Sequence, residues 1–283
     1  MPRRADPPYV ETKPPPKPAG AIRVVTWNVN SVRLRIALVA KLARATDADV
    51  ICLQETKAEN PVFPTAAIAK LGYAHQHFHG DKGYNGVAIL SRLPLSNPGR
   101  RLWAGKEDSR HVEATLPGAI DLHCVYVPAG GDIPDPAANP KFGHKLRFLE
   151  HLAEHWAGQP RGVKRILVGD LNVAPLENDV WSHKQLLDVV SHTPPETTRF
   201  ARLIEAHGWV DAVRALHPEP QRLYTWWSYR NRDWRASDRG RRLDHVWITP
   251  ELRPALRGVH LLKGARDWRQ GSDHVPVAVD LVP

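Results

Sequence analysis

Several apolar runs of this 283-residue chain end in side chains that can bind a cation or a phosphate. The clearest run lies in segment 164–175, where it is followed by Asp170, Leu171 and Asn172. A short apolar run predicts a strand buried on both faces, and in extended geometry Asp170 and Asn172 point the same way while Leu171 points into the core. A carboxylate beside an amide suits a site that holds water, a metal or phosphate. Alternatively, the two residues start a turn and cap the segment after Pro175.

The same pattern predicts three more strands, over residues 22–28, 49–55 and 120–126. Each run ends in a polar side chain, and these are Asn28, Glu55 and Tyr126. Because the sites of layered α/β proteins lie at strand ends, we expect these side chains to meet Asp170.

Two motifs near the C-terminus combine aspartate with histidine. Segment 242–248 predicts a strand with Asp244 in its interior, where a carboxylate is costly unless it is paired. Asp273 and His274 precede the last predicted strand. An aspartate that hydrogen-bonds a histidine orients the imidazole and stabilises its cation. His245 offers a second, competing partner for Asp244.

The stretch 222–242 combines seven arginines with two aspartates (7 − 2 = +5) and five aromatic residues. Arginine binds phosphates through several donors, and exposed aromatic rings stack on bases for roughly 1–3 kcal/mol each. Segment 224–226 predicts a strand, so we expect about half of the aromatic residues to pack into the core. The other aromatic residues and the arginines predict a nucleic-acid-binding face that includes Trp226, Trp227, Arg230, Trp234 and Arg241.

The composition limits the class of protein. A chain of 283 residues with 42% hydrophobic content can bury one large core or two modest ones, and we expect a single domain over residues 21–283. Residues 1–20 are rich in proline and poor in apolar side chains, which predicts a loose, disordered arm. The formal charge of +9 predicts a polyanionic partner, with nucleic acid ahead of an anionic membrane surface.

Cysteine usage and hydropathy indicate the compartment. Cys52 and Cys124 lie in apolar runs, which predicts buried, reduced thiols and a reducing compartment. No apolar stretch approaches the roughly 20 residues that span a bilayer, and Arg3-Arg4 is followed by prolines and charges instead of a signal core. We therefore expect a cytoplasmic protein without a membrane partner.

The remaining elements follow from periodicity and turn residues. Helical spacing predicts helices over 142–156, around 180–190 and over 196–207. A turn at 83–86 is expected to lead into a strand at 87–91. Predicted helices thus alternate with predicted strands, as in an α/β protein.

Nine motifs occur in order between about residue 22 and residue 283. They are Thr26-Trp-Asn-Val-Asn-Ser31, Leu53-Gln-Glu-Thr56, Tyr84-Asn-Gly-Val-Ala88, Val125-Tyr-Val-Pro128, Gly169-Asp-Leu-Asn-Val-Ala-Pro175, Asp179-Val-Trp181, Tyr224-Thr-Trp-Trp227, Arg242-Leu-Asp244 and Ser272-Asp-His274. In these motifs the chain resembles the exonuclease III family of apurinic/apyrimidinic (AP) endonucleases, within the endonuclease/exonuclease/phosphatase superfamily. The resemblance implies a four-layer α/β sandwich, in which two mixed β-sheets pack face to face and helices cover both outer sides.

The resemblance also implies a reaction, which is hydrolysis of the DNA phosphodiester 5′ to an abasic site together with 3′–5′ exonuclease and 3′-end trimming activity. The implied cofactor is Mg²⁺, with Mn²⁺ as a substitute. Glu55 is expected to be the principal metal ligand, with Asn28 close to it and Asp273 near the metal. Asp170 is expected to activate or orient the attacking water, with Asn172 holding Asp170 and the phosphate.

Two further roles are implied by the resemblance. His274, oriented by Asp244, is expected to donate to a phosphoryl oxygen, and Tyr126 to contact the phosphate or assist the leaving oxygen. Hard oxygen ligands suit Mg²⁺, and the charge that grows in the transition state needs a cation and aimed donors. If a second metal binds roughly 3.5–4 Å from the first, the available ligands are Asp170, Asn172, Asp273 and His274.

The chain departs from the family pattern at two positions that handle substrate. In Tyr126-Val-Pro-Ala-Gly130 an alanine replaces the usual asparagine, which removes an amide near the phosphate path. Arg241 stands where relatives often carry an apolar or aromatic residue near the abasic pocket. The tryptophans of the stretch 222–242 offer compensating stacking, and the loop 129–140 is a further element expected to face DNA.

Two other functions compete with the main expectation. The same metal centre would also serve another phosphodiester, such as RNA ends or phospholipid head groups, because fold does not fix function. A catalytically inactive DNA-binding protein is the other alternative, although Glu55 and Asp170 are both retained. We expect a monomer without an obligate protein partner, acting on double-stranded DNA at abasic sites or 3′ ends.

Overall fold

The computed structural model describes residues 12–231 and 233–283, and in this part of the chain the strands form two six-stranded mixed sheets. The first sheet has the order β11-β12-β1-β2-β4-β3, and its strands are β1 (Ile22–Asn28), β2 (Val50–Gln54), β3 (His75–Asp81), β4 (Tyr84–Ser91), β11 (Leu256–Leu261) and β12 (Val277–Leu281). The second has the order β5-β6-β7-β8-β10-β9, and its strands are β5 (Ser96–Arg100), β6 (His111–Leu116), β7 (Ile120–Tyr126), β8 (Arg165–Asp170), β9 (Val210–Asp211) and β10 (Asp244–Ile248).

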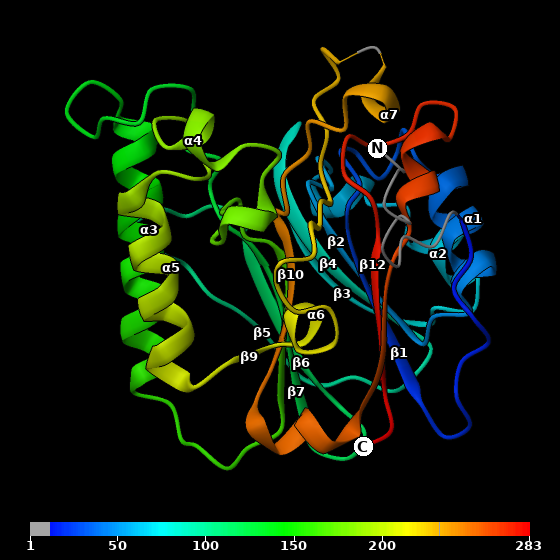
Figure 1. The fold of residues 1–283 in the computed structure, drawn as a ribbon. Helices are drawn as coiled ribbons and strands as arrows, with labels where there is room; N and C mark the ends of the chain where they lie inside the picture. Colours follow the sequence, from blue (N-terminus) through cyan, green and yellow to red (C-terminus); the bar gives the residue numbers. More distant parts are fainter. Residues whose placement is uncertain (1–11, 232) are drawn as a thin grey trace.

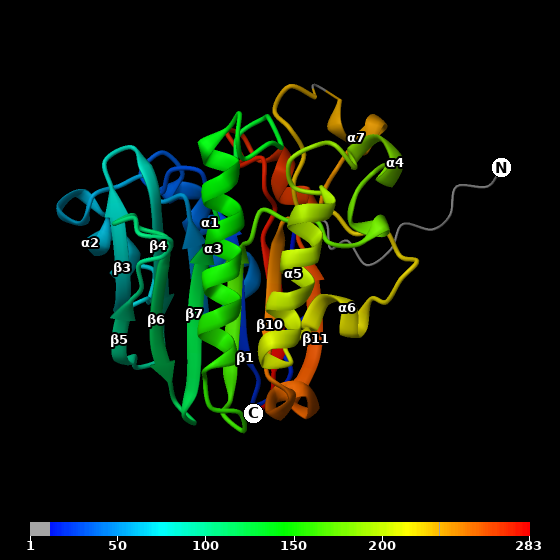
Figure 2. The same cartoon turned by 90° about the vertical axis from the view of Figure 1, so that its left-hand side faces the viewer.

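Helices cover the outer face of each sheet (Figures 1 and 2). The first sheet is covered by α1 (Ile36–Thr46) and α2 (Thr65–Ala69), and the second by α3 (Pro140–Ala157) and α5 (Pro194–His207). The shorter elements are α4 (His183–Leu186), α6 (Ala212–Leu216), α7 (Trp234–Ser237), η1 (Asn60–Val62), η2 (Glu177–Asp179), η3 (Pro250–Ala255) and η4 (Lys263–Asp267). The predicted four-layer sandwich is confirmed.

Local sequence explains the two long helices of the second sheet. The Asn139 side chain accepts from the backbone N–H of Lys141 at the start of α3, where Pro140 occupies a first-turn position that needs no N–H donor. Helix α5 begins with a capping box between Thr193 and Glu196, and it ends at Gly208 in the left-handed conformation.

The space between the sheets is filled by apolar side chains from both of them. Cys52 of β2 and Cys124 of β7 lie in this core as free thiols, as the sequence predicts. Burial, followed by the neighbouring Cys124, raises the pKa of Cys52 well above its ordinary value, so this thiol stays protonated and unreactive.

Pairing geometry brings the polar strand ends to one edge of the sandwich. Strands β1 and β2 are parallel, and so are β7 and β8, so each pair delivers its carboxyl ends together. Strand β10 runs antiparallel to β8 with Asp244 opposite Asp170. This edge is the upper one in Figure 1, where α7 lies.

Several predicted elements differ from the structure. Asp244 is the first residue of β10, not an interior one, because the chain enters this strand directly from the stretch 222–242. The helix predicted around 180–190 is reduced to α4, and segment 224–226 forms isolated bridges at Trp226 instead of a strand. Strand β4 begins at Tyr84, inside the predicted turn.

The proline-rich arm is only partly described. Residues 1–11 lie outside the described residues. The following segment has no helix or strand but is not loose, since Lys17 pairs with Asp49 at 2.7 Å and Arg23 donates to the carbonyl of Pro15 at 3.0 Å. Within the described residues, no helix combines the length and the apolar character needed to cross a membrane.

Candidate active site

Asp170 is the buried centre of the polar edge. Its side chain accepts hydrogen bonds from the Asn172 backbone N–H at 3.0 Å, the Asn172 amide at 3.2 Å and the Asn28 amide at 2.9 Å. The strand ends at Asp170, and Asn172 adopts a positive φ of 52°, so the extended geometry predicted for 170–172 does not continue. The two side chains still meet, because the turn folds Asn172 back onto the carboxylate, while Leu171 is fully buried as predicted.

Gly169 is required immediately before this carboxylate. Its φ is 149°, and a Cβ at this position would lie 1.8 Å from the carbonyl oxygen of Val125 on the parallel strand β7. Only glycine allows β7 and β8 to approach this closely, so the backbone contact fixes where β8 delivers Asp170.

Glu55 follows β2 directly and also has a positive φ, of 50°. Its Oε1 accepts from the Asn28 amide and from the Tyr126 hydroxyl, both at 2.9 Å, and its Oε2 pairs with the Lys57 ammonium at 2.8 Å. Burial opposes ionisation of Glu55, but the Asn28 hydrogen bond and the Lys57 ammonium outweigh it and lower the pKa. Asn28 donates to both Glu55 and Asp170, so one amide sets the spacing of the two carboxylates.

His274 joins the two aspartates of the edge. Its Nδ1 lies 2.8 Å from Asp244 Oδ2 and its Nε2 lies 3.6 Å from Asp170 Oδ2. Asp244 is held in turn by Thr225, whose hydroxyl accepts from the Asp244 backbone N–H at 3.1 Å. Asp244 therefore selects His274 as its partner, and the competing His245 belongs to the other face of β10, where it contacts Phe200 of α5.

The charges of this group are coupled. Burial opposes protonation of His274, but Asp244 and Asp170 together raise its pKa to about 10, so the imidazole is a cation at neutral pH. Burial raises the pKa of Asp170 to about 7 against the opposing effect of His274. A carboxyl group with this pKa is able to take up and release a proton near neutral pH.

Candidate metal ligands at this edge are one compact group of side chains and one more widely spaced set of carboxylates. Asp170, Asp244 and His274 present ligand atoms within 4.8 Å of one another, but a protonated His274 with both nitrogens aimed at carboxylates has no free lone pair for a metal. The oxygens of Glu55, Asp170 and Asp273 line the same groove and are hard ligands of the kind that Mg²⁺ prefers. The Glu55 carboxylate already carries one cation, the Lys57 ammonium.

These side chains form the floor of a groove with a volume of about 1000 Å³. Its walls come from the loop after β7 and from the stretch 222–242. The lining residues that sequence patterns indicated are Glu55, Asp170, Asn172, Trp226, Arg230, Arg241, Asp273 and His274. Asn28 and Tyr126 lie behind Glu55, to which both donate, and Asp244 lies behind His274.

The predicted stacking of Trp227 and Trp234 on DNA bases is wrong. Trp227 is fully buried and its indole N–H donates to Asp238, while Trp234 is 6% exposed and its indole N–H donates to Asp267. Both indoles pack against each other in a small core, with ring centroids 5.0 Å apart, so neither ring is available to a base. Arg242 is also removed from the basic face, because it is buried in an ion-pair network with Asp179.

Trp226 and Arg241 do line the groove. The Trp226 indole N–H donates to Asp273 at 3.0 Å, which fixes the ring beside the carboxylates. The Arg241 guanidinium lies over this ring, 5.3 Å from its centroid, and donates to the Val190 carbonyl and the Ser191 hydroxyl. The position that departs from the family pattern therefore forms a cation–π stack at the groove wall.

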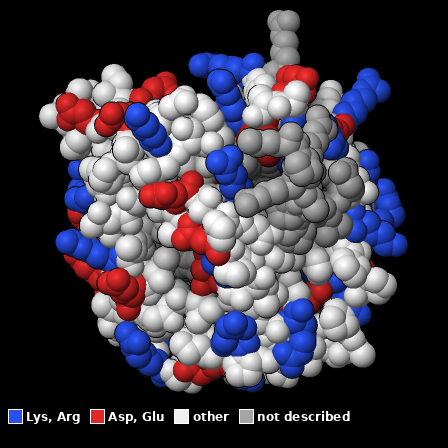
Figure 3. Space-filling view, viewed as in Figure 1, with Lys and Arg blue, Asp and Glu red and all other residues white. Residues whose placement is uncertain are grey.

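Other residues of the groove lie in segments that were expected to face DNA but were not singled out as site residues. Ala129, Gly131 and Asp132 belong to the loop 129–140, and Arg239 belongs to the basic stretch, where it lies over Trp181 at 4.7 Å from the ring centroid. The stretch also contributes Ser228, Asn231 and Ser237. Sequence patterns assigned no role to Trp181, Val189, Val190, Ser191 and Leu243, which also line the groove. On the face shown in Figure 3, both basic and acidic side chains lie at the upper end of the molecule.

Comparisons with known proteins agree with this geometry. A family model described as Endonuclease/Exonuclease/phosphatase family matches residues 25–274. Exodeoxyribonuclease III of Haemophilus influenzae is 28% identical over 268 residues, which covers 90% of this chain and 98% of the relative.

Two solved structures are similar over almost their whole length. An AP endonuclease from Archaeoglobus fulgidus has a TM-score of 0.86 and 32% identity, with 92% of this chain and 99% of that chain covered. The 3′ phosphatase NExo from Neisseria, solved with its product DNA hairpin, has a TM-score of 0.85 and 30% identity over the same shares of the two chains. The similarity therefore extends over both sheets and the groove.

Proposed function

Because the chain belongs to the Endonuclease/Exonuclease/phosphatase family, we propose that it is a DNA repair nuclease that cleaves the phosphodiester 5′ to abasic sites and trims 3′ ends. The observation that carries this proposal is Asp170, a buried carboxylate held by three hydrogen bonds from two asparagines and lying 3.6 Å from the His274 ring. A proton acceptor and a fixed cation thus share the floor of a groove with a volume of about 1000 Å³.

The protonation states of Asp170 and His274 determine their roles in the proposed reaction. Asp170, with a pKa near 7, takes the proton of an attacking water molecule. His274 stays protonated through Asp244 and donates to a phosphoryl oxygen, where negative charge grows. Asn172 holds Asp170 through its backbone N–H and its amide. The Tyr126 hydroxyl donates to Glu55 from behind, so it positions this carboxylate instead of contacting the phosphate as predicted.

Glu55 and Asp273 are the residues we assign to a divalent cation, with Asp170 completing the donor set. These donors are oxygen atoms, which fits Mg²⁺ and its substitute Mn²⁺. When bound, such an ion polarises the phosphoryl oxygen and offsets the charge of the transition state. Asn28, which was expected among the ligands, turns its amide N–H groups to Glu55 and Asp170, and its oxygen accepts from the Asn30 backbone N–H at 3.1 Å, so it positions the ligands instead. Asn28 keeps Glu55 and Asp170 at a fixed spacing for this purpose.

The groove walls suit DNA better than a small phosphoester. Trp226 presents an indole whose orientation is fixed by Asp273, and Arg230, Arg239 and Arg241 stand around it as phosphate donors. All these groups come from one chain, so we propose that the enzyme acts as a monomer without an obligate protein partner. The free thiols Cys52 and Cys124 suit a reducing compartment such as the cytoplasm.

Cleavage of an end-labelled duplex with a single tetrahydrofuran abasic analogue tests this proposal. We expect one cut 5′ to the analogue with Mg²⁺, and its loss with EDTA or with Glu55→Ala. Glu107→Ala removes an exposed carboxylate outside the groove and is the matched control. A ladder from the 3′ end would make the protein chiefly an exonuclease. No cleavage of the duplex would reject DNA and direct the test to RNA ends and phospholipid head groups.

A further inference from the structure

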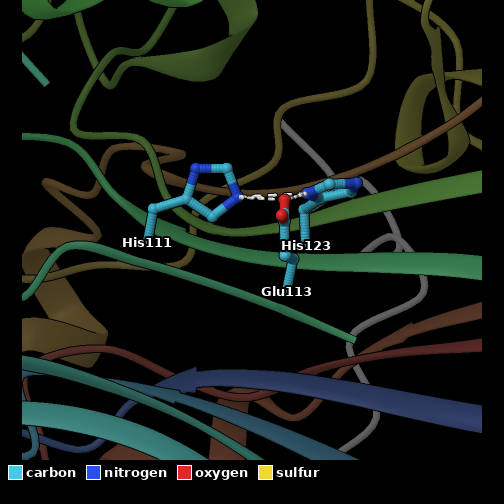
Figure 4. A group of neighbouring side chains, drawn as sticks. All are labelled: His111, Glu113 and His123. Carbon is cyan, nitrogen blue, oxygen red and sulfur yellow. Dashed lines mark hydrogen bonds and ion pairs between the residues drawn. The ribbon is translucent and has the colours of Figure 1, made fainter. Parts of the chain in front are cut away.

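Three ionisable side chains form a separate cluster on the outer face of the second sheet. His111 and Glu113 are two residues apart on β6, and His123 lies directly opposite Glu113 on β7. Their neighbours Val112, Leu122 and Cys124 point into the core between the sheets, so the cluster faces away from that core, and His123 packs against Trp156 of α3. Figure 4 shows the two imidazoles on either side of the Glu113 carboxylate.

The distances within the cluster suit a single small cation. His111 Nε2 lies 3.1 Å from His123 Nδ1, and Glu113 Oε2 lies 3.1 Å from His123 Nδ1 and 4.0 Å from His111 Nε2. For a triangle with these three sides, the point equidistant from the corners is about 2.0 Å from each, which is the length of a zinc–nitrogen or zinc–oxygen bond. An ion at this point would lie in the plane of the three atoms, so a tetrahedral site needs His111 Nε2 and Glu113 Oε2 to come closer than their separation of 4.0 Å.

Protons alone do not satisfy these three atoms. The Trp103 indole N–H donates to His111 Nδ1 at 3.1 Å, so a neutral His111 carries its proton on Nε2, facing His123 Nδ1. With its proton on Nδ1, His123 donates to Glu113 Oε2 at 3.1 Å but faces the His111 N–H, and with its proton on Nε2 it accepts from His111 but turns a lone pair to Glu113. Each tautomer therefore leaves one unfavourable contact.

The surroundings provide orientation and access. Arg101 donates to both Glu113 oxygens, at 2.7 and 2.8 Å, which fixes the carboxylate and leaves a lone pair on Oε2 directed at the histidines. A cavity of about 220 Å³ borders Glu113 and His123. An ion could enter through it, and water could fill the fourth position.

We propose that His111, Glu113 and His123 form a second metal site of this protein, which binds a divalent transition metal of the zinc class with water as the fourth ligand. Two imidazoles and one carboxylate are ligands that zinc accepts, and Mg²⁺, which prefers oxygen, is disfavoured there. The ion would join β6 to β7 on the outer face of the second sheet. The site does not depend on the proposed nuclease function.

Metal binding also requires a change of tautomer at His111. An imidazole that binds zinc through Nε2 has its proton on Nδ1, where Trp103 now donates. The Trp103 N–H therefore competes with the metal, and Trp103→Phe is expected to tighten binding by about fivefold, the equivalent of one hydrogen bond. If the cluster had a purely structural role, Trp103→Phe would not increase the affinity for the metal.

Cobalt titration of the metal-free full-length protein, in excess Mg²⁺ to saturate oxygen sites, tests the proposal. We expect one Co²⁺ per chain with the intense visible absorption of a tetrahedral site, and displacement by Zn²⁺. His123→Phe keeps the ring that packs on Trp156 but removes the ligand nitrogen, and Glu113→Gln removes the carboxylate. Each is expected to weaken binding by more than roughly 100-fold.

His75→Ala is the matched control, because it removes an exposed histidine on β3 and should leave the cobalt spectrum unchanged. Circular dichroism of the metal-free variants tests whether they are folded. If one of the two ligand variants does not fold, the cobalt affinity of the other tests the proposal. Wild-type affinity in a folded His123→Phe or Glu113→Gln protein would overturn the proposal. A weak cobalt spectrum of the wild type, typical of six-coordinate Co²⁺, would also overturn it. The same holds if Glu55→Gln, and not the cluster variants, abolished the cobalt spectrum.

Discussion

At the scale of single residues, Asp170 shows how burial and neighbours set the properties of one carboxylate. Its side chain is almost completely buried, which raises its pKa, while three hydrogen bonds and the His274 cation keep it from becoming a simple neutral acid. The carboxyl group therefore takes up and releases a proton near neutral pH. A substitution that removes this ability but keeps the shape of the side chain distinguishes a role in cleavage from a role in DNA binding.

Asp170→Asn should lower the single-turnover cleavage rate by roughly 10²–10⁴-fold, because it removes the proton acceptor of the attacking water. DNA affinity should change by less than about threefold, since no phosphate-binding cation is lost. Quench-flow cleavage and equilibrium binding measure the two effects. Asp132→Asn, which removes a carboxylate elsewhere in the groove, should cleave normally. A variant that binds poorly but cleaves bound DNA at the normal rate would contradict the role of Asp170.

Arg241→Ala should weaken DNA binding and lower the slope of log affinity against log salt by about 0.9, the value for one phosphate contact. The guanidinium is held over Trp226 by the carbonyl of Val190, so it is ordered before DNA arrives. Binding isotherms between low and moderate salt give the slope. Arg257→Ala removes an equal charge outside the groove and should leave the slope nearly unchanged. An unaltered slope for Arg241→Ala would remove this arginine from the DNA contact.

At the scale of elements, the helices of the second sheet support the groove from behind. Lys145 of α3 is fully buried, forms an ion pair with Glu196 of α5 and donates to the Asn172 carbonyl at 2.7 Å. Glu196 also accepts from the backbone N–H groups of Ser191 and Thr193. The pair thus joins two helices to the turn that carries Asn172, and burial lowers the pKa of Lys145 against the effect of Glu196.

Lys145→Met should destabilise the protein by about 3–5 kcal/mol, because it leaves Glu196 buried without its cation. Cleavage should also slow, since the Asn172 carbonyl loses its donor. Urea unfolding gives the stability, and single-turnover kinetics give the rate. The double variant Lys145→Met with Glu196→Gln should recover part of the stability but not the rate. If the single variant were as stable as the wild type, the ion pair would not support this turn.

At the scale of the whole molecule, stability depends on pH because some histidines are buried in their neutral form. His245 is fully buried on the outer face of β10, where Arg242 donates to its Nδ1 and its Nε2 lies 2.8 Å from the Val173 carbonyl. This arrangement fixes a neutral imidazole with its proton on Nε2. Burial, followed by the Arg242 cation, lowers the pKa of His245 from 6.5 to about 4. The free energy of unfolding is therefore coupled to pH.

Between pH 6.5 and 4 the unfolded chain binds a proton at this histidine that the folded protein does not. The contribution of His245 to stability is therefore complete above pH 6.5 and decreases as the pH falls towards 4, by about 3 kcal/mol in total. Urea unfolding at several pH values measures the slope. His245→Gln should reduce the slope, whereas His75→Gln, at an exposed position, should not. An identical slope in wild type and His245→Gln would contradict this coupling.

Local patterns in the sequence determined the strands and the ends at which they present polar groups. Period-2 alternation and short apolar runs are local properties, so the positions of Asn28, Glu55, Tyr126 and Asp170 followed from them and agree with the structure. The nine motifs, which occur in the order found in the family, predicted the four-layer α/β sandwich. The fold was therefore accessible from the sequence alone.

Tertiary structure decided which neighbours share a face. In the irregular stretch 222–242 no period separates Trp226, which lines the groove, from Trp227, which is buried, because such a stretch takes its orientation from the surfaces it contacts. The choice of His274 over His245 as partner of Asp244 arose because adjacent residues of a strand point to opposite faces. The cluster around Glu113 arose from cross-strand register, which long-range pairing sets.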